Sequence, residues 1–247
     1  MPHGFSQIAL YFLKKIKILG VKITKSQVIP YPVDVDKYKK SSKGLDRLLN
    51  ILGFSKTDII ILAVGRLVEK KGFEFLIRSL PRLVEKNKRI KLVIVGDGDL
   101  KDKLILLTEE LGISRWIKFA GTINREEILY YYNIADIFVM PSIQDAMGNI
   151  DDQPVSLLEA MACSLPVVAT NFPGIALNVK DHANGFLTPQ RGVKEIEAAL
   201  LKLISSKNLR QKMGRESRRV AVSNVSLDNI GTRYIQLFKE VLNSKYG

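Results

Sequence analysis

Residues 145–170 read DAMGNIDDQPVSLLEAMACSLPVVAT and divide into a polar loop, an apolar helix and an apolar strand. Pro154 suits the first turn of a helix, because its missing N–H has no partner there. The Ala-rich run that follows predicts a buried helix, and PVVAT predicts a strand behind it. The helix start leaves the N–H groups of Val155, Ser156 and Leu157 free, and such groups can bind an anion.

An acidic side chain interrupts the apolar helix about one turn after its start. Glu159 has apolar neighbours, and a buried carboxylate is costly unless it finds a hydrogen-bonding partner. A carboxylate at this position can also accept hydrogen bonds from sugar hydroxyls. Asp151 precedes Glu159 by eight positions, and Asp145 is a competing candidate for the first acid of the pair.

The alternation of apolar strands and amphipathic helices extends through most of the chain. Six short apolar runs predict buried strands, and helical spacing is typical of the segments between them. The predicted strands are Ile59–Val64, Lys91–Val95, Trp116–Ala120, Asp136–Met140, Leu165–Thr170 and Gly185–Leu187. We therefore expect an α/β fold, namely a Rossmann-like open parallel sheet of about six strands with helices on both faces.

Seven segments predict helices around this sheet, besides the one that carries Glu159. They are residues 6–19, Leu45–Leu52, Gly72–Lys86, Leu100–Leu111, Arg125–Ile134, Val193–Ile204 and Leu227–Leu242. Val28–Asp34 predicts a short strand that two prolines break, because each proline restricts the residue before it to extended geometry.

The turns after the predicted strands hold candidate ligand-binding groups, because ligands bind beyond the carboxyl ends of such strands. GRLVEKKG, from Gly65 to Gly72, follows the first strand and contributes two cations, Arg66 and Lys71. Its spacing differs from those of a P-loop and of a G-x-G-x-x-G fingerprint, which argues against a dinucleotide-binding domain. Gly96 and Gly98 form a tight turn after the second strand.

Composition limits the compartment and the partners. The chain has 247 residues, 46% hydrophobic content and a net charge of +13. The single cysteine, Cys163, excludes a disulfide framework and indicates a reducing, cytoplasmic compartment. No apolar run approaches the ~20 residues that span a bilayer, and no signal peptide is recognisable. The basic excess favours an anionic partner, either a phosphorylated substrate or a membrane surface at its cytoplasmic face; no nucleic-acid-binding motif is present.

These motifs together resemble the family-4 (group 1) glycosyltransferases. The resemblance rests on Asp151 and Glu159-Ala160-Met161-Ala162 at the family's acid spacing, and on Pro166-Val167-Val168-Ala169-Thr170. Gly65-Arg66…Lys71-Gly72, Gly96-Asp97-Gly98, Phe119–Ile123 and Asn184–Leu187 match further family motifs. Leu177 departs from the pattern, because it stands where the family has an acid.

The resemblance implies retaining transfer of a hexosyl group from a nucleotide-diphosphate sugar, without a metal or another cofactor. It implies that Arg66 and Lys71 neutralise the donor diphosphate, that Asp151 faces the donor sugar, and that Glu159 binds the ribose hydroxyls. We assign catalysis to Asp151, Arg66 and Lys71. The expected donor-binding residues are Gly65, Arg66, Lys71, Gly96, Gly98, Thr122, Ile123, Asp152, Gln153, Pro154, Val155, Ser156, Leu157 and Glu159.

The resemblance covers roughly residues 20 to 244 and corresponds to the donor-binding half of a two-domain family. It implies that residues 1–30 are a remnant of an N-terminal acceptor domain plus a linker. Residues 31–230 would then form the nucleotide-sugar-binding domain, and residues 231–247 a helix that crosses back to the missing half. A separate acceptor-domain polypeptide, or self-association of this chain, would complete the two-domain arrangement. The alternatives are a non-catalytic nucleotide-sugar-binding or scaffolding subunit and a sugar-nucleotide epimerase-like domain.

Overall fold

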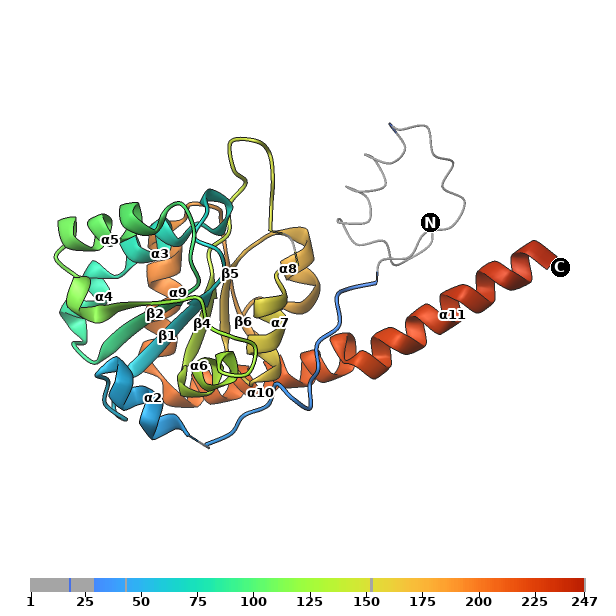
Figure 1. Cartoon of the computed structure of the whole chain (residues 1–247), viewed down its shortest axis with the longest axis horizontal. Helices are drawn as coiled ribbons and strands as arrows, with labels where there is room; N and C mark the ends of the chain where they lie inside the picture. Colours follow the sequence, from blue (N-terminus) through green and yellow to red (C-terminus); the bar gives the residue numbers. More distant parts are fainter. Residues whose placement is uncertain (1–17, 19–28, 43, 152, 247) are drawn as a thin grey trace.

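A six-stranded parallel sheet forms the centre of the molecule (Figure 1). The structure is a computed structural model that describes residues 18, 29–42, 44–151 and 153–246. The strands lie in the order β3-β2-β1-β4-β5-β6. Their bounds are Ile59–Val64 (β1), Ile90–Val95 (β2), Ile117–Gly121 (β3), Ile137–Met140 (β4), Val167–Thr170 (β5) and Gly185–Thr188 (β6). The predicted fold class is therefore confirmed, and the predicted strand ends differ by two residues or fewer.

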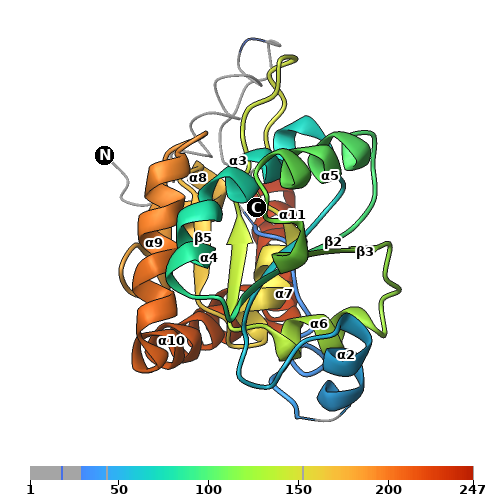
Figure 2. The ribbon, with the colours of Figure 1, turned by 90° about the vertical axis from the view of Figure 1, so that its left-hand side faces the viewer.

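Helices cover both faces of the sheet, because its strands are apolar on both sides. In β1, Ile60 and Leu62 belong to one core, while Ile61 and Ala63 belong to the other. On the first face lie α2 (Leu45–Leu52), α6 (Ile128–Ile134), α7 (Val155–Ala162) and α10 (Lys207–Val225). On the second face, which Figure 2 turns toward the viewer, lie α3 (Phe73–Ser79), α4 (Pro81–Lys86), α5 (Lys101–Glu110) and α9 (Val193–Ser205).

Several predicted boundaries were wrong for local reasons. The predicted helix Gly72–Lys86 is two helices, since Pro81 has no N–H for the ladder and begins α4. Helix α6 begins at Ile128 rather than Arg125. The predicted strand Val28–Asp34 is absent from its described part, residues 29–34, where Val33 makes only an isolated bridge with Ser226. The predicted helix 6–19 lies outside the described residues, apart from Ile18.

Two α-helices were not predicted. Helix α8 (Pro173–Asn178) is short, and α10 is long but polar along most of its length. The buried positions of α10 include small residues, such as Gly214, Ser217 and Ala221, which give little apolar signal. A Cβ atom on Gly214 would lie 2.2 Å from the carbonyl oxygen of Ser164. The absence of a side chain therefore permits the close packing of α10 against the end of α7.

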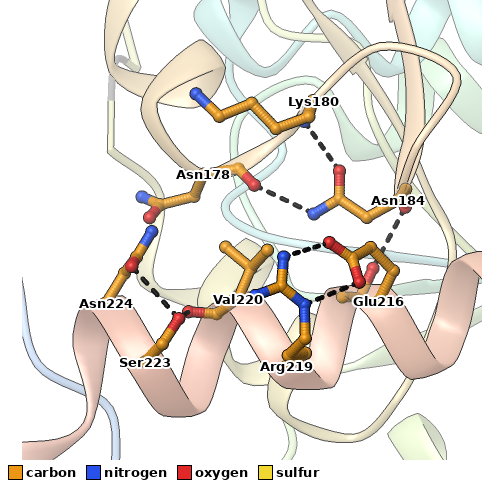
Figure 3. A network of polar contacts seen from close by, with 9 residues as sticks. Asn178, Lys180, Asn184, Glu216, Arg219, Val220, Ser223 and Asn224 are labelled. Atoms are coloured by element: carbon orange, nitrogen blue, oxygen red, sulfur yellow. Dashed lines mark hydrogen bonds and ion pairs between the residues drawn. The ribbon is translucent and has the colours of Figure 1, made fainter.

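Buried hydrogen bonds tie the turn before β6 to both α8 and α10 (Figure 3). The fully buried Asn184 donates from Nδ2 to the Asn178 carbonyl at 2.9 Å, and its Oδ1 accepts from the Lys180 N–H at 2.7 Å. Ser217 of α10 donates to the Asn184 carbonyl at 3.0 Å. These bonds satisfy groups that burial would otherwise leave unpaired.

The last helix, α11 (Leu227–Tyr246), leaves the body of the domain after its first turn (Figure 1). Ile230 is buried against the core. An apolar face beyond it is exposed and comprises Tyr234, Ile235, Phe238, Val241 and Leu242. Among the described helices, none combines the length and apolar character that crossing a bilayer requires.

Arg218 joins three segments that are distant in the sequence. Its Nη1 atom donates to the carbonyl oxygens of Val35 at 2.7 Å, Tyr38 at 2.8 Å and Ala162 at 2.9 Å. It thereby fastens the segment before α2 to the C-terminal end of α7 and to α10. The next residue, Arg219, is exposed and pairs only with Glu216 on its own helix in the described part of the chain (Figure 3).

We predict that Arg218→Met lowers the free energy of unfolding by about 2 kcal/mol, because three carbonyls lose a charged donor. Arg219→Met is the matched control and should leave that free energy nearly unchanged, because an exposed ion pair contributes little. Urea denaturation followed by circular dichroism measures both. Equal effects of the two substitutions would contradict the role given to Arg218.

Candidate functional site

A cavity of about 460 Å³ opens at the carboxyl edge of the sheet, beside the turns that follow β1, β2 and β3. Six of the predicted donor-binding residues line it: Gly65, Arg66, Gly96, Thr122, Ile123 and Glu159. Its wall also contains residues that sequence reasoning did not select, among them Tyr38, Asn124 and Arg125. The cavity thus combines cationic side chains, the carboxylates of Asp97 and Glu159, and two glycine turns.

The glycine turns bring the backbones of adjacent loops into contact. A Cβ atom on Gly96, whose φ is +133°, would lie 2.0 Å from the Gly65 carbonyl oxygen. A Cβ atom on Gly98 would lie 2.7 Å from the Leu67 carbonyl oxygen. Only glycine allows this packing, because a Cβ atom at either position would collide with the backbone of the β1 turn. Gly98 serves that packing and does not itself line the cavity.

Lys71 and Asp151 form an ion pair next to the β1 turn. Their side chains are only 12% and 18% exposed. A Cβ atom on Gly65 would lie 2.9 Å from Cε of Lys71, so the glycine makes room for the lysine. The structure therefore brings together two of the three predicted catalytic groups, while Arg66, the third, lies on the cavity wall.

Asp145, the competing first acid, is engaged within its own loop. Its Oδ1 accepts from the N–H groups of Met147 at 3.0 Å and Asn149 at 2.8 Å. Its Oδ2 accepts from Nδ2 of Asn149 at 3.1 Å. The geometry therefore favours Asp151 as the first acid of the pair. Asp152 lies outside the described residues.

The start of α7 differs in detail from the sequence prediction. Pro154 is the N-cap residue, and the helix begins at Val155. The N–H of Leu157 was predicted to be free, but it donates to the Pro154 carbonyl at 3.1 Å, because the first turn is tight. Ser156 donates from its hydroxyl to the Val64 carbonyl at 3.2 Å and so fixes the helix start beside the end of β1.

Gln153 does not line the cavity and instead contacts the segment that precedes α2. Its Oε1 accepts from the N–H of Tyr31 at 3.3 Å. Pro154, Val155, Ser156 and Leu157 also lie outside the cavity lining. The helix start thus adjoins the β1 turn through Ser156, while Glu159 is the residue of α7 that reaches the cavity.

Glu159 has the partner that its apolar surroundings require. Its Oε2 accepts a 2.7 Å hydrogen bond from the Tyr132 hydroxyl. Burial, and then the Glu159 charge, raise the pKa of Tyr132 well above its ordinary value, so this hydroxyl remains a donor. The sequence analysis did not select Tyr132, and an acid within an apolar helix was the only signal that such a contact exists. Within the described residues, no cluster of three or more His, Cys, Asp or Glu side chains is arranged to hold a metal ion.

The model of the family described as glycosyl transferases group 1 matches residues 46–220, which is more than half of the chain. The chain belongs to the group 1 glycosyltransferases. An uncharacterized glycosyltransferase, MJ1607 of Methanocaldococcus jannaschii, is 28% identical over 89% of this chain and 54% of its own length. The D-inositol 3-phosphate glycosyltransferase of Corynebacterium jeikeium is 33% identical over 76% of this chain and 45% of its own length. The chain thus spans about half the length of these curated relatives.

Solved glycosyltransferase structures share the fold. The UDP complex of Anabaena Alr3699/HepE superimposes with a TM-score of 0.82 at 22% identity. The match covers 95% of this chain and 62% of the Anabaena chain. At this identity the match supports the fold, and the assignment to group 1 rests on the family model.

Cys163 follows Glu159 by one turn of α7 and is fully buried. Burial raises the pKa of its thiol to about 12, while Lys40 opposes this shift and Glu159 adds to it. A thiolate is the reactive form, so a thiol with this pKa is inert near neutrality.

We predict that Cys163 in the native protein does not react with Ellman's reagent at pH 8. After unfolding in guanidinium chloride, one thiol per chain should react, because an exposed cysteine has a pKa of about 8.5. Absorbance of the released thiolate measures both states. Rapid modification of the native protein would contradict the burial of this side chain.

Proposed function

We propose that this group 1 glycosyltransferase chain binds the nucleotide-diphosphate sugar donor and supplies the donor half of a retaining hexosyl transfer. The observation that carries the proposal is the cavity that Arg66, the Gly65 and Gly96 turns, and Glu159 share at the carboxyl edge of the sheet. This is where ligands bind in open α/β sheets. The UDP complex of the similar Anabaena protein supports a nucleoside diphosphate as the ligand class.

The cations have a specific use in such a reaction. When the sugar leaves its donor, negative charge accumulates on the nucleoside diphosphate. Arg66 and Lys71 follow the same strand, and their charges stabilise the departing diphosphate more than the intact donor. The N-terminus of α7 adds its positive dipole end next to the β1 turn. In this proposal these groups perform the charge neutralisation, and no metal ion is required.

The two acids have separate parts in the proposed reaction. Glu159 lines the cavity and accepts hydrogen bonds from the ribose hydroxyls of the donor. Asp151 lies beside Lys71 and supports the positive charge that develops on the sugar as it is transferred. The curated relatives extend well beyond the part that this chain matches. We propose that the acceptor is bound by a second half, either on a partner polypeptide or on another part of the protein.

We predict that Arg66→Glu and Lys71→Glu each weaken binding of the preferred nucleoside diphosphate by at least about tenfold, because a charge-assisted contact with phosphate is replaced by repulsion. Calorimetric titration with UDP, GDP and ADP measures the affinities and identifies the base. Lys212→Glu, an exposed reversal on α10 away from the cavity, is the matched control for net charge. Unchanged affinity in both site variants would refute diphosphate binding here.

We predict that Asp151→Asn tightens nucleoside diphosphate binding by about threefold or more. The substitution removes a negative charge near the phosphates and releases Lys71 from its ion pair. The same variant should lose donor hydrolysis or transfer, since the developing sugar cation loses its support. Calorimetry and a donor-turnover assay with the acceptor half added separate the two effects. Weaker nucleotide binding in Asp151→Asn would contradict this role.

A non-catalytic, nucleotide-sugar-binding subunit is the second candidate. It is favoured by Leu177 of α8, an apolar residue where the family pattern has an acid. This candidate predicts nucleotide binding in calorimetry but no donor turnover under any condition. Restoration of turnover by an added acceptor half would exclude it.

A further inference from the structure

The anchoring of Glu159 extends beyond a single hydrogen bond. Tyr132, the donor to its Oε2, lies on α6, and its side chain is 0% exposed. The Tyr132 ring packs against Phe138 of β4, with ring centroids 6.1 Å apart. It also meets Tyr38 edge-on at 6.0 Å. The rigid core of the domain therefore sets the position of the Tyr132 hydroxyl.

Tyr38 places a second hydroxyl near the same carboxylate, at the cavity wall. Burial first, and then Glu159, raise the pKa of Tyr38, while Arg125 on the cavity rim opposes this shift. Both tyrosines therefore stay neutral and protonated near neutral pH. Neutral donors can hold a carboxylate in place without cancelling its charge, whereas a lysine or arginine would form an ion pair with it.

We propose that Tyr132 is a positioning residue that holds the Glu159 carboxylate toward the ribose of the donor. This inference rests on the proposed function, because it assigns Glu159 to the ribose hydroxyls. A glutamate has several rotatable bonds, and binding a diol would otherwise require ordering all of them. Tyr132 occupies one carboxylate oxygen in advance, and Glu159 still lines the cavity. Tyr132 therefore controls the preference of the site for a ribose that carries its hydroxyl groups over a sugar that lacks them.

Calorimetry on the full chain first identifies which of UDP, GDP and ADP binds best. The test then compares the affinity for that nucleotide with the affinity for its 2′,3′-dideoxy counterpart. The wild-type protein should prefer the ribose form by about tenfold or more, the scale of a hydrogen bond to a charged group. In Tyr132→Phe this preference should fall to about threefold or less, while affinity for the dideoxy form changes by less than about twofold.

The neighbouring Tyr131→Phe is the matched control. Tyr131 is also buried on α6, but it does not donate to Glu159. It should retain the full ribose preference. A purely structural role of Tyr132 would weaken binding of both nucleotide forms equally, and that result would overturn the proposal. An unchanged ribose preference in Tyr132→Phe would overturn it as well, while leaving nucleotide binding by the cavity intact.

A double variant guards against loss of folding. Tyr132→Phe retains the aromatic ring but removes one hydrogen-bond donor from the Glu159 carboxylate. Adding Glu159→Gln removes the charge of that carboxylate. Thermal unfolding verifies the fold of each variant. The ribose preference of the double variant should equal that of Glu159→Gln alone, because Tyr132 acts only through Glu159. A further loss would overturn the inference. Failure of the wild-type protein to bind any of the three nucleotides would refute the proposed function itself, and the positioning role with it.

Discussion

Strand β1 pairs with β2 on one side and with β4 on the other, and this change in strand order decides where a ligand can approach the sheet. The connection after β1 passes over one face through α3 and α4, whereas the connection after β4 passes over the opposite face through α7. The two loops therefore diverge and leave a crevice between them. Arg66 stands at one side of this crevice and α7 at the other, although nearly ninety residues separate them.

The two acids of the motif are held in different ways, and the difference has electrostatic consequences. Asp151 is paired with a cation, so its charge is largely balanced locally, and in the proposed reaction Lys71 would exchange this partner for the phosphate. Glu159 is paired with a neutral hydroxyl, so its full charge remains. A charged acceptor suits the binding of hydroxyl groups, which can only donate to it. One motif thereby combines an exchangeable ion pair with a fixed acceptor.

Periodicity along the sequence predicted the strands well, because runs such as IIILAV have no polar residue that would place them at a surface. It missed α10, whose buried side includes Gly214, Ser217 and Ala221. The glycine turns and the helix start were recognised as motifs, but the Leu157 bond to Pro154 depends on the tightness of one turn. Tyr132 could not be chosen from the tyrosines around it, since 27 residues separate it from Glu159. Contacts of this kind depend on the tertiary fold, which places α6 and α7 over the same face of the sheet.

The segment from Val33 to Tyr38 is attached to the domain at several points. The Val33 N–H donates to the Val225 carbonyl at 2.8 Å, which fixes the backbone at this position. Further along, Arg218 donates to the carbonyls of Val35 and Tyr38. Tyr38 itself is embedded in the core and reaches the cavity wall. Because Tyr31 is also held, by its hydrogen bond to Gln153, a displacement of this segment would be transmitted to Tyr38 and so to the wall of the cavity.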